Sequence, residues 1–493
     1  MPTVLELLMP TAILAGAGVA IALLTPLIER APGRERLLTA LVAAPFLASL
    51  VSIINLGRSY YSQQSPFLNV SIAGQPYLAS SSSFLVDAMS IYMVVVYLFL
   101  GFISCIYGAL YMGRHRFSPM YCALALTTVG FLIAGTFSGD LLTLFIFWEI
   151  ATTASYGLIV FEKKPESLEA CLKFLIMIVL GSGLIVYGLS IVYGLTGSLN
   201  FWAVRSALIA EPDKRMLITA FTFIASGYAI EAAIVPFHMW LPDVYTASPA
   251  STSALMSAVM DQASYYVLIR VLIYILTPPA VVNWVQALAV FSVITMTTGN
   301  LFALVQDNVK RMISYVCIAD IGYNLIAITS VTPLGVEGNL FFFLTGGSMT
   351  ALSFMCIGLL NRMGFETLED LSGIGSTSLR TALPLTIVAL SFSGIPPLAG
   401  FIAKYMIFTA AIEANMWWLA VIGVVNSVIE TGYFLRLIHV MFFRTPKKDV
   451  KTQPQVNLLI PIYALVVELI VLGACPSAAL ALISPAARQI PIP

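Results

Sequence analysis

Residues 228–243 read YAIEAAIVPFHMWLPD, a mostly apolar stretch that holds the acidic residue Glu231 and two prolines, Pro236 and Pro242. A proline in the interior of a helix removes a backbone hydrogen bond, and in lipid the freed carbonyl groups must find partners in protein or water. A charged side chain inside such a stretch is costly to bury in a bilayer and is typical of a functional position. The stretch therefore predicts a membrane helix that is broken beside an acidic group.

The composition of the chain places it in a membrane. Of its 493 residues, 59% are hydrophobic and 10% are charged, and the mean hydropathy is +0.94, whereas soluble domains are about half apolar and a quarter charged. The formal net charge is zero, and no charge run indicates a nucleic-acid partner. Six cysteines are scattered without a CxxC pair, and no Walker, GxGxxG, HExxH or GxSxG pattern occurs. We therefore expect no metal, no cofactor and no covalent catalysis in this chain.

Fourteen apolar segments are long enough to cross a membrane, since a bilayer core of ~30 Å needs about 20 residues of helix. Residues 8–28 have the length of a span and no basic region before them, so we interpret them as the first helix and not as a signal sequence. The approximate limits of the fourteen are 8–28, 37–55, 84–110, 119–137, 139–161, 167–194, 217–242, 249–277, 283–304, 309–332, 338–360, 381–414, 417–442 and 455–480.

The basic residues of the loops predict an orientation. Fifteen of the 24 Lys and Arg residues fall in one set of alternate loops, and five fall in the opposite set. The positive-inside rule then predicts a multi-pass protein of the cell membrane with both termini outside. The larger set comprises Arg30, Arg34, Arg36, Arg114, Arg116, Lys163, Lys164, Lys310, Arg311, Arg362, Arg380, Arg444, Lys447, Lys448 and Lys451.

A second interruption, SGIPPLAGF at residues 393–401, lies in the twelfth segment, five segments after the first. Broken helices at matching positions of two halves are typical of inverted repeats that surround a binding site. We therefore predict an all-α polytopic fold of about fourteen helices, in which helices 4–8 and 9–13 form two inverted repeats with helices 7 and 12 broken. The predicted divisions are 1–118 for helices 1–3, 119–280 and 281–445 for the two repeats, and 446–493 for the last helix.

Ionisable side chains inside the predicted spans are candidates for an ion path. Glu149 lies near the middle of the fifth span, and Glu231 lies where the seventh is expected to open. If both face one cavity, they cannot both stay ionised cheaply, so one holds a proton or the two share a cation. The structural alternatives are a hydrogen-bond anchor for Glu149 and a cap at the helix break for Glu231. Lys173, in the sixth span, either reaches the inner interface near Lys163 and Lys164 or forms an ion pair with Glu149.

Polar groups in later spans extend the candidate path. Asp261 and Gln262 are neighbours in the eighth span, and Asp320 lies deep in the tenth. A lipid-facing helix would not carry such groups, so a water-filled path is their simplest common cause. Lys404 follows the second break, where a buried lysine is suited to proton exchange. The alternative for Lys404 is a salt bridge.

Several other groups have weaker signals. His238, beside the first break, either titrates near neutral pH or is simply hydrogen-bonded. Arg270 is expected to be an interfacial or pairing residue. Possible extensions of the path in the C-terminal quarter are Glu430, Arg436, His439 and Glu468.

Three motifs resemble those of one family of membrane subunits. Residues 235–259, VPFHMWLPDVYTASPASTSALMSAV, resemble the VPFHxWLPDAHxxAPxxxSALLSG segment of the antiporter-like subunits of respiratory complex I, membrane-bound hydrogenases, coenzyme F420 dehydrogenases and Mrp-type Na⁺/H⁺ antiporters. Residues 306–323, QDNVKRMISYVCIADIGY, are similar to the family's QxDxKRxxAYSSIxxxG signature, and residues 393–408, SGIPPLAGFIAKYMIF, to its GxPPxxGFxxK signature. The matches run in the family's order from about residue 84 to 445.

The resemblance implies fourteen helices, broken helices 7 and 12, and a proton path along the polar midplane. The family's fifth-helix glutamate matches Glu149, and its twelfth-helix lysine matches Lys404. The family's ion-pair switch between the fifth-helix glutamate and a seventh-helix lysine cannot run unchanged here, because this sequence departs at the other basic positions. At those positions it has Glu231, Gln262, Gly346 and Thr350.

These departures leave three possibilities open. Carboxylates carry the protons, with Lys173 as the partner of Glu149; or the acidic cluster binds Na⁺ through oxygen ligands; or the subunit has lost pumping in part and transmits motion. We favour the first of the three.

The sequence therefore predicts a proton-translocating, antiporter-like membrane subunit of a redox-driven ion pump related to complex I, in the cell membrane of a bacterium or archaeon. We expect lipid and other membrane subunits, including homologous ones, as partners, with any Fe–S clusters, flavin or NiFe centre in partner subunits. The alternatives are an Mrp-type Na⁺/H⁺ antiporter subunit and a structural or coupling subunit that has lost pumping. A solitary transporter of a small solute would need a roomy midplane pocket, whereas these polar groups are strung along a line.

Overall fold

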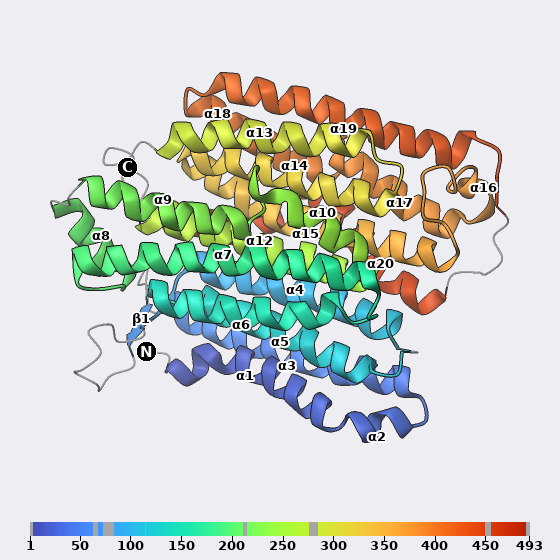
Figure 1. The fold of residues 1–493 in the computed structure, drawn as a ribbon, viewed down its shortest axis with the longest axis horizontal. Coiled ribbons are helices and arrows are strands. Elements are labelled where there is room, and N and C mark those ends of the chain that lie inside the picture. Colours follow the sequence, from blue (N-terminus) through green and yellow to red (C-terminus); the bar gives the residue numbers. More distant parts are fainter. Residues whose placement is uncertain are drawn as a thin grey trace.

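The computed structural model describes residues 3–62, 68–71, 83–113, 115–210, 214–275, 284–448 and 455–489. Long helices run side by side through one bundle (Figure 1). The elements up to residue 275 are α1 (Val4–Leu23), α2 (Thr25–Arg30), α3 (Arg34–Ser62), β1 (Leu68–Ser71), β2 (Ser83–Val86), α4 (Ala88–Tyr111), α5 (Ser118–Thr136), α6 (Leu141–Ile159), α7 (Pro165–Thr196), α8 (Phe201–Ala210), α9 (Lys214–Glu231), the 3-10 helix η1 (Phe237–Met239), α10 (Trp240–Ala247), α11 (Ala250–Leu255), the π-helix η2 (Met256–Met260), α12 (Asp261–Leu268) and the π-helix η3 (Ile269–Ile275). The elements after it are α13 (Trp284–Leu304), α14 (Val309–Ser330), α15 (Pro333–Arg362), α16 (Ile374–Thr377), α17 (Leu379–Phe392), α18 (Ala399–Glu413), α19 (Trp417–Phe443), α20 (Val456–Ala474) and α21 (Ser477–Gln489).

The helices confirm the all-α polytopic prediction. Among the described residues, 11 helices are long and apolar enough to cross a membrane, namely α1, α3, α4, α5, α6, α7, α13, α14, α15, α19 and α20. The other three predicted spans are built from consecutive elements: α9, η1 and α10; the run from α11 to η3; and α17 with α18. The predicted span limits at residues 277 and 283, and the loop charges Arg114 and Lys451, lie outside the described residues.

The first helix break falls where the prolines predict it. Helix α9 ends at Glu231, Ala233 has a positive φ of 51°, and the Val235–Pro236 peptide is cis. Helix α10 then begins at Trp240, whose Nε1 atom donates to the carbonyl oxygen of Ile230 at 3.0 Å. The indole therefore ties the start of α10 to the end of α9.

The second break has the same form in the twelfth predicted span. Helix α17 ends at Phe392, Gly394 has a φ of 69°, and α18 begins at Ala399 after a cis Pro396–Pro397 peptide. Glycine adopts this left-handed conformation without the steric penalty of a side chain.

Two parts of the architecture differ from the prediction. The last predicted span, 455–480, is not one helix, because α20 ends at Ala474 and α21 follows Pro476. The residue before a proline disfavours helical conformation, which explains the stop. The end of α20 packs on the second break, since a Cβ at Gly473 would lie 2.0 Å from the carbonyl oxygen of Pro397. The short helix α8 and the antiparallel pair β1–β2 were also not predicted.

Burial separates central from peripheral helices. In α14 and α15, 94% of the apolar 18-residue stretch of the helix is buried inside the protein. In α1, α3 and α7 the share is 33%. Helices α14 and α15 are therefore central, and α1, α3 and α7 face outward. Packing in lipid favours small residues that let backbones approach closely. Helices α7 and α9 show this, because a Cβ at Gly227 would lie 2.7 Å from the carbonyl oxygen of Gly181.

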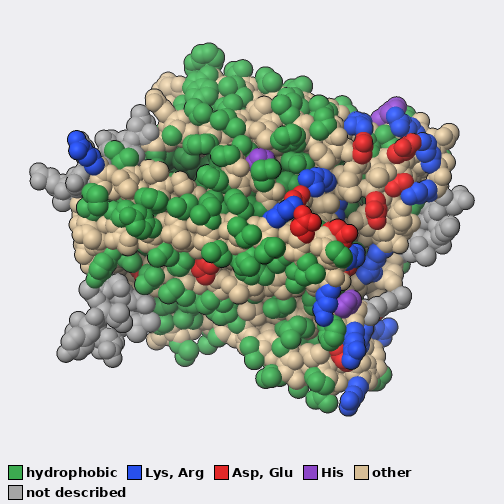
Figure 2. Space-filling view, viewed as in Figure 1, with side chains coloured by type: hydrophobic (Ala, Val, Ile, Leu, Met, Phe, Trp, Pro, Cys, Tyr) green, Lys and Arg blue, Asp and Glu red, His purple; other side chains and the backbone are tan. Residues whose placement is uncertain are grey.

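The surface is polarised along the bundle. Figure 2 shows one broad, mostly apolar face, on which most charged side chains gather toward the end where α2 and α16 lie. The end of α21 lies at the opposite end, beside the end of α3, where the Tyr60 hydroxyl donates to Gln489 Oε1 at 3.0 Å. We call the end where α2 and α16 lie the charged end of the bundle. The basic residues of the loops predict that this end faces the inside of the cell.

Candidate functional site

The charged pair at the second break consists of Lys404 on α18 and Glu430 on α19. Their Nζ and Oε2 atoms are 2.6 Å apart, and the exposed fractions of the two side chains are 4% and 0%. Lys404 also donates to the carbonyl oxygen of Phe392 at 2.6 Å and to Ser427 Oγ at 3.3 Å. Phe392 is the last residue of α17, so its carbonyl group lacks a helical partner. The helix break thus supplies a ligand for a buried ammonium group.

Aromatic and amide side chains complete the surroundings of this pair. The Tyr323 hydroxyl donates to Glu430 Oε2 at 3.1 Å, and Lys404 Nζ lies 4.5 Å from the centre of the Tyr323 ring. The amide of Asn300 on α13 donates to the Tyr323 hydroxyl at 3.4 Å and accepts from the Tyr433 hydroxyl at 3.1 Å. Glu430 Oε1 is buried and has no hydrogen-bond partner. The pair is therefore one end of a connected polar network.

Two further carboxyl groups continue the line toward the first repeat. Asp320, on the central helix α14, is 4% exposed, and neither of its carboxylate oxygens has a hydrogen-bond partner. Tyr323, one helical turn beyond Asp320 on α14, donates to Glu430, and Lys404, Glu430 and Asp261 are the charged groups that influence Asp320. Asp261 Oδ1 accepts a hydrogen bond of 2.6 Å from the hydroxyl of Tyr245 on α10. Because both Asp320 oxygens are unpartnered, these groups are neighbouring charges and not a hydrogen-bonded chain.

A second acidic group lies at the first break. Glu231 accepts a hydrogen bond of 2.7 Å from Trp148 Nε1, while its other oxygen is buried without a partner. The next residue on α6, Glu149, accepts a 2.6 Å hydrogen bond from Ser182 on α7, and the two carboxyl groups are within electrostatic range of each other. Glu231 is also the last residue of α9, where the helix dipole disfavours negative charge. The hydrogen-bond donors that reach the two carboxyl groups, Trp148 and Ser182, are neutral, so no cation among the described residues pairs with either of them.

Helix α10 has a contact beside Glu231 at its start and a contact with Asp261 farther along. Trp240 at its start donates to the carbonyl oxygen of Ile230, next to Glu231, and Tyr245, five residues later, donates to Asp261. Among the hydrogen bonds of the described residues, none joins Glu231 to Asp261 directly. The second half of the broken helix is therefore the structural link between the two parts of the site.

Lys173 is not the partner of Glu149. Its Nζ atom pairs with Asp243 at 2.9 Å and with Glu169 at 3.0 Å, and its side chain is 49% exposed. Lys173 and Ser182, which does bind Glu149, are nine residues apart on α7, or about 13 Å along a helix. Lys173 therefore lies near the charged end, as the interfacial alternative predicts, and the ion-pair alternative is wrong.

Two residues that the sequence predicts for the ion path, Gln262 and His238, make no hydrogen bond to its carboxyl groups or to Lys404 among the described residues. Gln262 Nε2 donates to the carbonyl oxygen of Ser257 at 3.1 Å, and its Oε1 atom is buried without a partner. His238 on η1 has a buried Nδ1 atom that also lacks a partner. At the family's eleventh-helix positions, Thr350 Oγ1 donates to the carbonyl oxygen of Gly346 in its own helix, so it adds no proton-binding group.

The weaker candidates separate into three kinds. Arg436 donates to the carbonyl oxygen of Leu304 and pairs with the exposed Asp307 at 3.4 Å, so it does not extend the path, and His439 stacks on Phe443. Arg270 is a pairing residue: it bonds both carboxylate oxygens of Asp87, which caps α4, at 2.6 Å. Glu468 on α20 has two buried oxygens without hydrogen-bond partners.

Sequence reasoning missed several contacts of the site. Trp148, Ser182, Tyr245 and Asp243 each bind a charged residue. Asp243 and Tyr245 stand inside the quoted motif at residues 235–259, so their position was a usable signal. Trp148 and Ser182 stand in none of the quoted motifs, and their partners depend on the rotation and packing of separate helices. Within the described parts of the chain, no group of three or more His, Cys, Asp or Glu side chains could hold a metal ion.

A hollow beside Lys404 opens between α18 and α19. Its volume is about 410 Å³, and its lining is mainly apolar, with Phe401, Tyr405 and Phe408 from α18 and Val424 and Val428 from α19. Ser393, Gly394, Ser427 and Thr431 provide polar atoms in its lining. The buried lysine can thus be approached from the side of the bundle.

Comparisons with known proteins agree with this geometry. The sequence profile of the family described as "NADH:quinone oxidoreductase/Mrp antiporter, TM" matches residues 138–430, which include the breaks and the groups around them. NADH-quinone oxidoreductase subunit N of Trichlorobacter lovleyi is 31% identical over 452 residues, which cover 90% of this chain and 89% of the relative.

Two solved structures share the fold. A chain of respiratory complex I from Thermus thermophilus with bound aureothin is 26% identical with a TM-score of 0.77, covering 96% of this chain and 99% of that one. A chain of the Mrp complex from Dietzia sp. has a TM-score of 0.87 over 99% of this chain and 98% of its own length, at 22% identity. The second likeness is one of fold alone.

Proposed function

Because the chain belongs to the NADH:quinone oxidoreductase/Mrp antiporter family of transmembrane subunits, we propose that it carries protons across the membrane as an antiporter-like subunit of a redox-driven complex related to respiratory complex I. The observation that carries the proposal is the buried Lys404–Glu430 pair at a broken helix, next to the unpartnered carboxyl group of Asp320. A charge at this depth is expensive and is typical of ion and proton pathways.

Carboxyl groups replace bases in the first part of this route. Glu149 and Glu231 hold one proton between them, because two negative charges at close range in a low dielectric repel strongly. Trp148 and Ser182 hold one oxygen of each carboxyl group and leave the rest free to exchange a proton. This is the first of the three possibilities, with Ser182 in place of Lys173 as the partner of Glu149.

In the second part the proton passes from Asp261 toward Lys404. A proton that reaches Asp320 removes a negative charge near Lys404 and weakens the field that keeps the lysine protonated. Lys404 can then release its proton away from Asp320, toward the hollow between α18 and α19, while Glu430 and the carbonyl oxygen of Phe392 hold its amine in place. The proton on Asp320 then passes to Lys404 and restores the pair, so one proton has moved past Lys404. The step is directional when a neighbouring subunit biases it.

The same proposal includes the setting of the chain. The basic residues at the charged end support an orientation with that end inside and both termini outside, in the plasma membrane of a bacterium or archaeon. The broad apolar face and the exposed large hydrophobic side chains of the outer helices support contacts with lipid and with other membrane subunits, including homologous ones. Fe–S clusters, flavin or a NiFe centre would then belong to partner subunits that supply the redox reaction.

Two other functions have specific support. An Mrp-type Na⁺/H⁺ antiporter subunit is favoured by the oxygen atoms near Asp320: Asn324 donates to the Asp320 carbonyl oxygen, Asn339 donates to the Asn324 carbonyl oxygen, and the side-chain oxygens of all three residues are buried without partners. A structural or coupling subunit without pumping is favoured by the loss of bases at Glu231, Gln262, Gly346 and Thr350.

The test is transport by the intact complex in membrane vesicles, with NADH and a water-soluble quinone as the redox pair and a pH-sensitive dye as the reporter. Lys404→Ala and Glu149→Gln are expected to abolish or strongly reduce proton movement per electron pair. Lys448→Ala is the matched control, because Lys448 pairs with Asp370 at the exposed end and touches no path residue. Undiminished proton movement in Lys404→Ala would refute the pumping role, and a strict requirement for Na⁺ would favour the antiporter alternative.

A further inference from the structure

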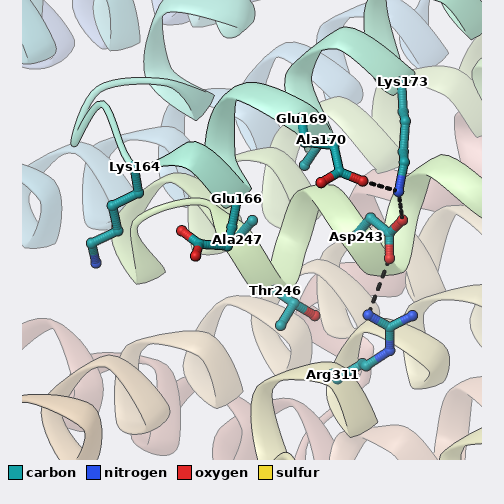
Figure 3. A pocket seen from close by; sticks show the side chains of 9 residues that line it. All are labelled: Lys164, Glu166, Glu169, Ala170, Lys173, Asp243, Thr246, Ala247 and Arg311. Atoms are coloured by element: carbon teal, nitrogen blue, oxygen red, sulfur yellow. Dashed lines mark hydrogen bonds and ion pairs between the residues drawn. The ribbon is translucent and has the colours of Figure 1, made fainter.

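Asp243 of α10 joins three helices at the charged end of the bundle. Its Oδ2 atom pairs with Lys173 of α7 at 2.9 Å, and its Oδ1 atom pairs with Arg311 of α14 at 3.0 Å. Figure 3 shows the carboxyl group lying between the two cations, with Glu169 on the far side of Lys173. The cluster of Lys173, Asp243 and Arg311 is called the clamp below.

The residue before Arg311 reinforces the clamp. Lys310 is 6% exposed, and its Nζ atom donates to the carbonyl oxygens of Thr246 and Ser248. These carbonyl groups belong to the last turn and the end of α10, where a cation satisfies unpaired acceptors and complements the helix dipole. The first turn of α14 therefore holds α10 at two points. Arg311 pairs with the Asp243 side chain, and Lys310 binds backbone carbonyl groups at the end of α10.

Each of the three clamped helices also carries a contact of the proposed proton route. Helix α7 carries Ser182, which binds Glu149, and α10 carries Tyr245, which binds Asp261. Helix α14 carries Asp320 itself, nine residues beyond Arg311, or about 13 Å along the helix. Tyr245 is only two residues from Asp243, so a shift of α10 at the clamp moves its hydroxyl relative to Asp261.

We propose that Asp243 is a positioning residue for proton transfer: by tying α10 to α7 and α14, it keeps the Tyr245 hydroxyl on Asp261. The inference rests on the proposed function, because it gives the Tyr245–Asp261 contact a role in the route. Asp243 itself lies outside that route, with its side chain 26% exposed at the clamp.

The competing explanation is a solvated surface cluster that adds a little stability and nothing else. Exposed ion pairs are individually weak, so the two explanations predict similar stability for an Asp243 variant. They differ in whether the effect on transport passes through Tyr245. A double-mutant cycle measures this, because changes that act through one contact are not additive.

The experiment measures protons moved per electron pair by vesicles that contain the complete complex, for Asp243→Asn, Tyr245→Phe and the double variant. We expect Asp243→Asn to lower transport about two- to thirtyfold, the range that two exposed ion pairs provide. The double variant should be no worse than Tyr245→Phe alone, and Asp243→Glu should restore most of the loss. Glu169→Gln is the matched control, because it removes the other partner of Lys173 without touching α10, and it should transport as the wild type does.

Three results would overturn the inference: wild-type transport in Asp243→Asn, multiplying effects in the double variant, or a loss in Glu169→Gln equal to that in Asp243→Asn. The amount of assembled complex on native gels separates loss of assembly from loss of transport. Lys404→Ala distinguishes the two proposals. If that variant pumps normally the proposed function fails, and if it does not pump while Asp243→Asn does, the positioning role alone fails.

Discussion

Replacement of the buried Lys404–Glu430 pair separates stability from transport. Lys404→Met removes the cation and leaves the Glu430 carboxylate buried with the Tyr323 hydroxyl as its donor. It also leaves the Phe392 carbonyl group without a partner at the break. A second variant, Lys404→Met with Glu430→Leu, removes both charges and fills the space with apolar atoms.

The magnitudes follow from the geometry. At the observed N–O distance of 2.6 Å, the attraction is about 6 kcal/mol at an effective dielectric constant of about 20, before the cost of desolvating both groups. Removal of one partner of a buried pair costs about 3–5 kcal/mol, because an uncompensated charge remains. In the double variant the unpaired Phe392 carbonyl and Tyr323 hydroxyl remain, at about 1–3 kcal/mol each, and the Phe392 carbonyl is equally unpaired in the single variant. The double variant should therefore be more stable than the single one, although it carries more changes.

The assay is SDS-induced unfolding in mixed micelles, combined with proton transport by vesicles that contain the assembled complex. Transport should be lost in both variants, whereas stability should fall in Lys404→Met and recover in the double variant. A double variant that is less stable than Lys404→Met would refute the reasoning, because it would mean that the unpaired Glu430 charge is not the main cause of the lost stability. Transport that returns along with stability would show that the pair serves folding alone.

Three further outcomes are expected. Arg270→Leu leaves a buried carboxylate at the start of α4 without its cation and should cost about 3–5 kcal/mol in the same unfolding assay, while protons moved per electron pair stay unchanged in the complex that still assembles. Gly227→Ala should destabilise by about 1–3 kcal/mol through overpacking, because its Cβ would lie 2.7 Å from a carbonyl oxygen of α7, whereas Gly16→Ala, with nothing within 4 Å, should not. Outside the spans, the hydrogen bond and charge of Lys447 lower the pKa of the Glu369 carboxyl. This pair therefore stabilises the fold at pH values above the ordinary carboxyl pKa, and its contribution is lost as the pH falls through the lowered pKa. NMR titration should show the pKa of Glu369 returning toward its ordinary value in Lys447→Ala.

The membrane fold was predictable because its determinants are local in sequence. Apolar length predicts the spans, and prolines with glycine predict the breaks after Glu231 and Phe392. The end of the last span was not predicted, since the run of apolar residues continues past Pro476 into α21. Hydropathy measures length in the membrane and does not distinguish one helix from two in succession.

The charged residues of the site were predictable, but their partners were not. Lys404 and Glu430 are 26 residues apart on different helices, and Lys173 and Asp243 are 70 residues apart. Which carboxyl group meets which cation depends on how two helices are rotated and shifted, and residue type does not encode this. Lys173 illustrates the problem: a position one helical turn or two deeper would have brought it toward Glu149.

Charge balance along the line explains how acids can replace the family's bases. Among the described path residues, Lys404 is the one cation, and Glu430 neutralises it at 2.6 Å. The remaining carboxyl groups, Glu149, Glu231 and those of Asp261 and Asp320, have neutral hydrogen-bond donors or none. Glu231 and Asp320 are buried, whereas Glu149 and Asp261 are half-buried. An uncompensated buried negative charge is costly, so under the proposed function Glu231 and Asp320 are the carboxyl groups expected to hold protons. In that proposal the family's switch by making and breaking ion pairs is needed at Lys404 alone.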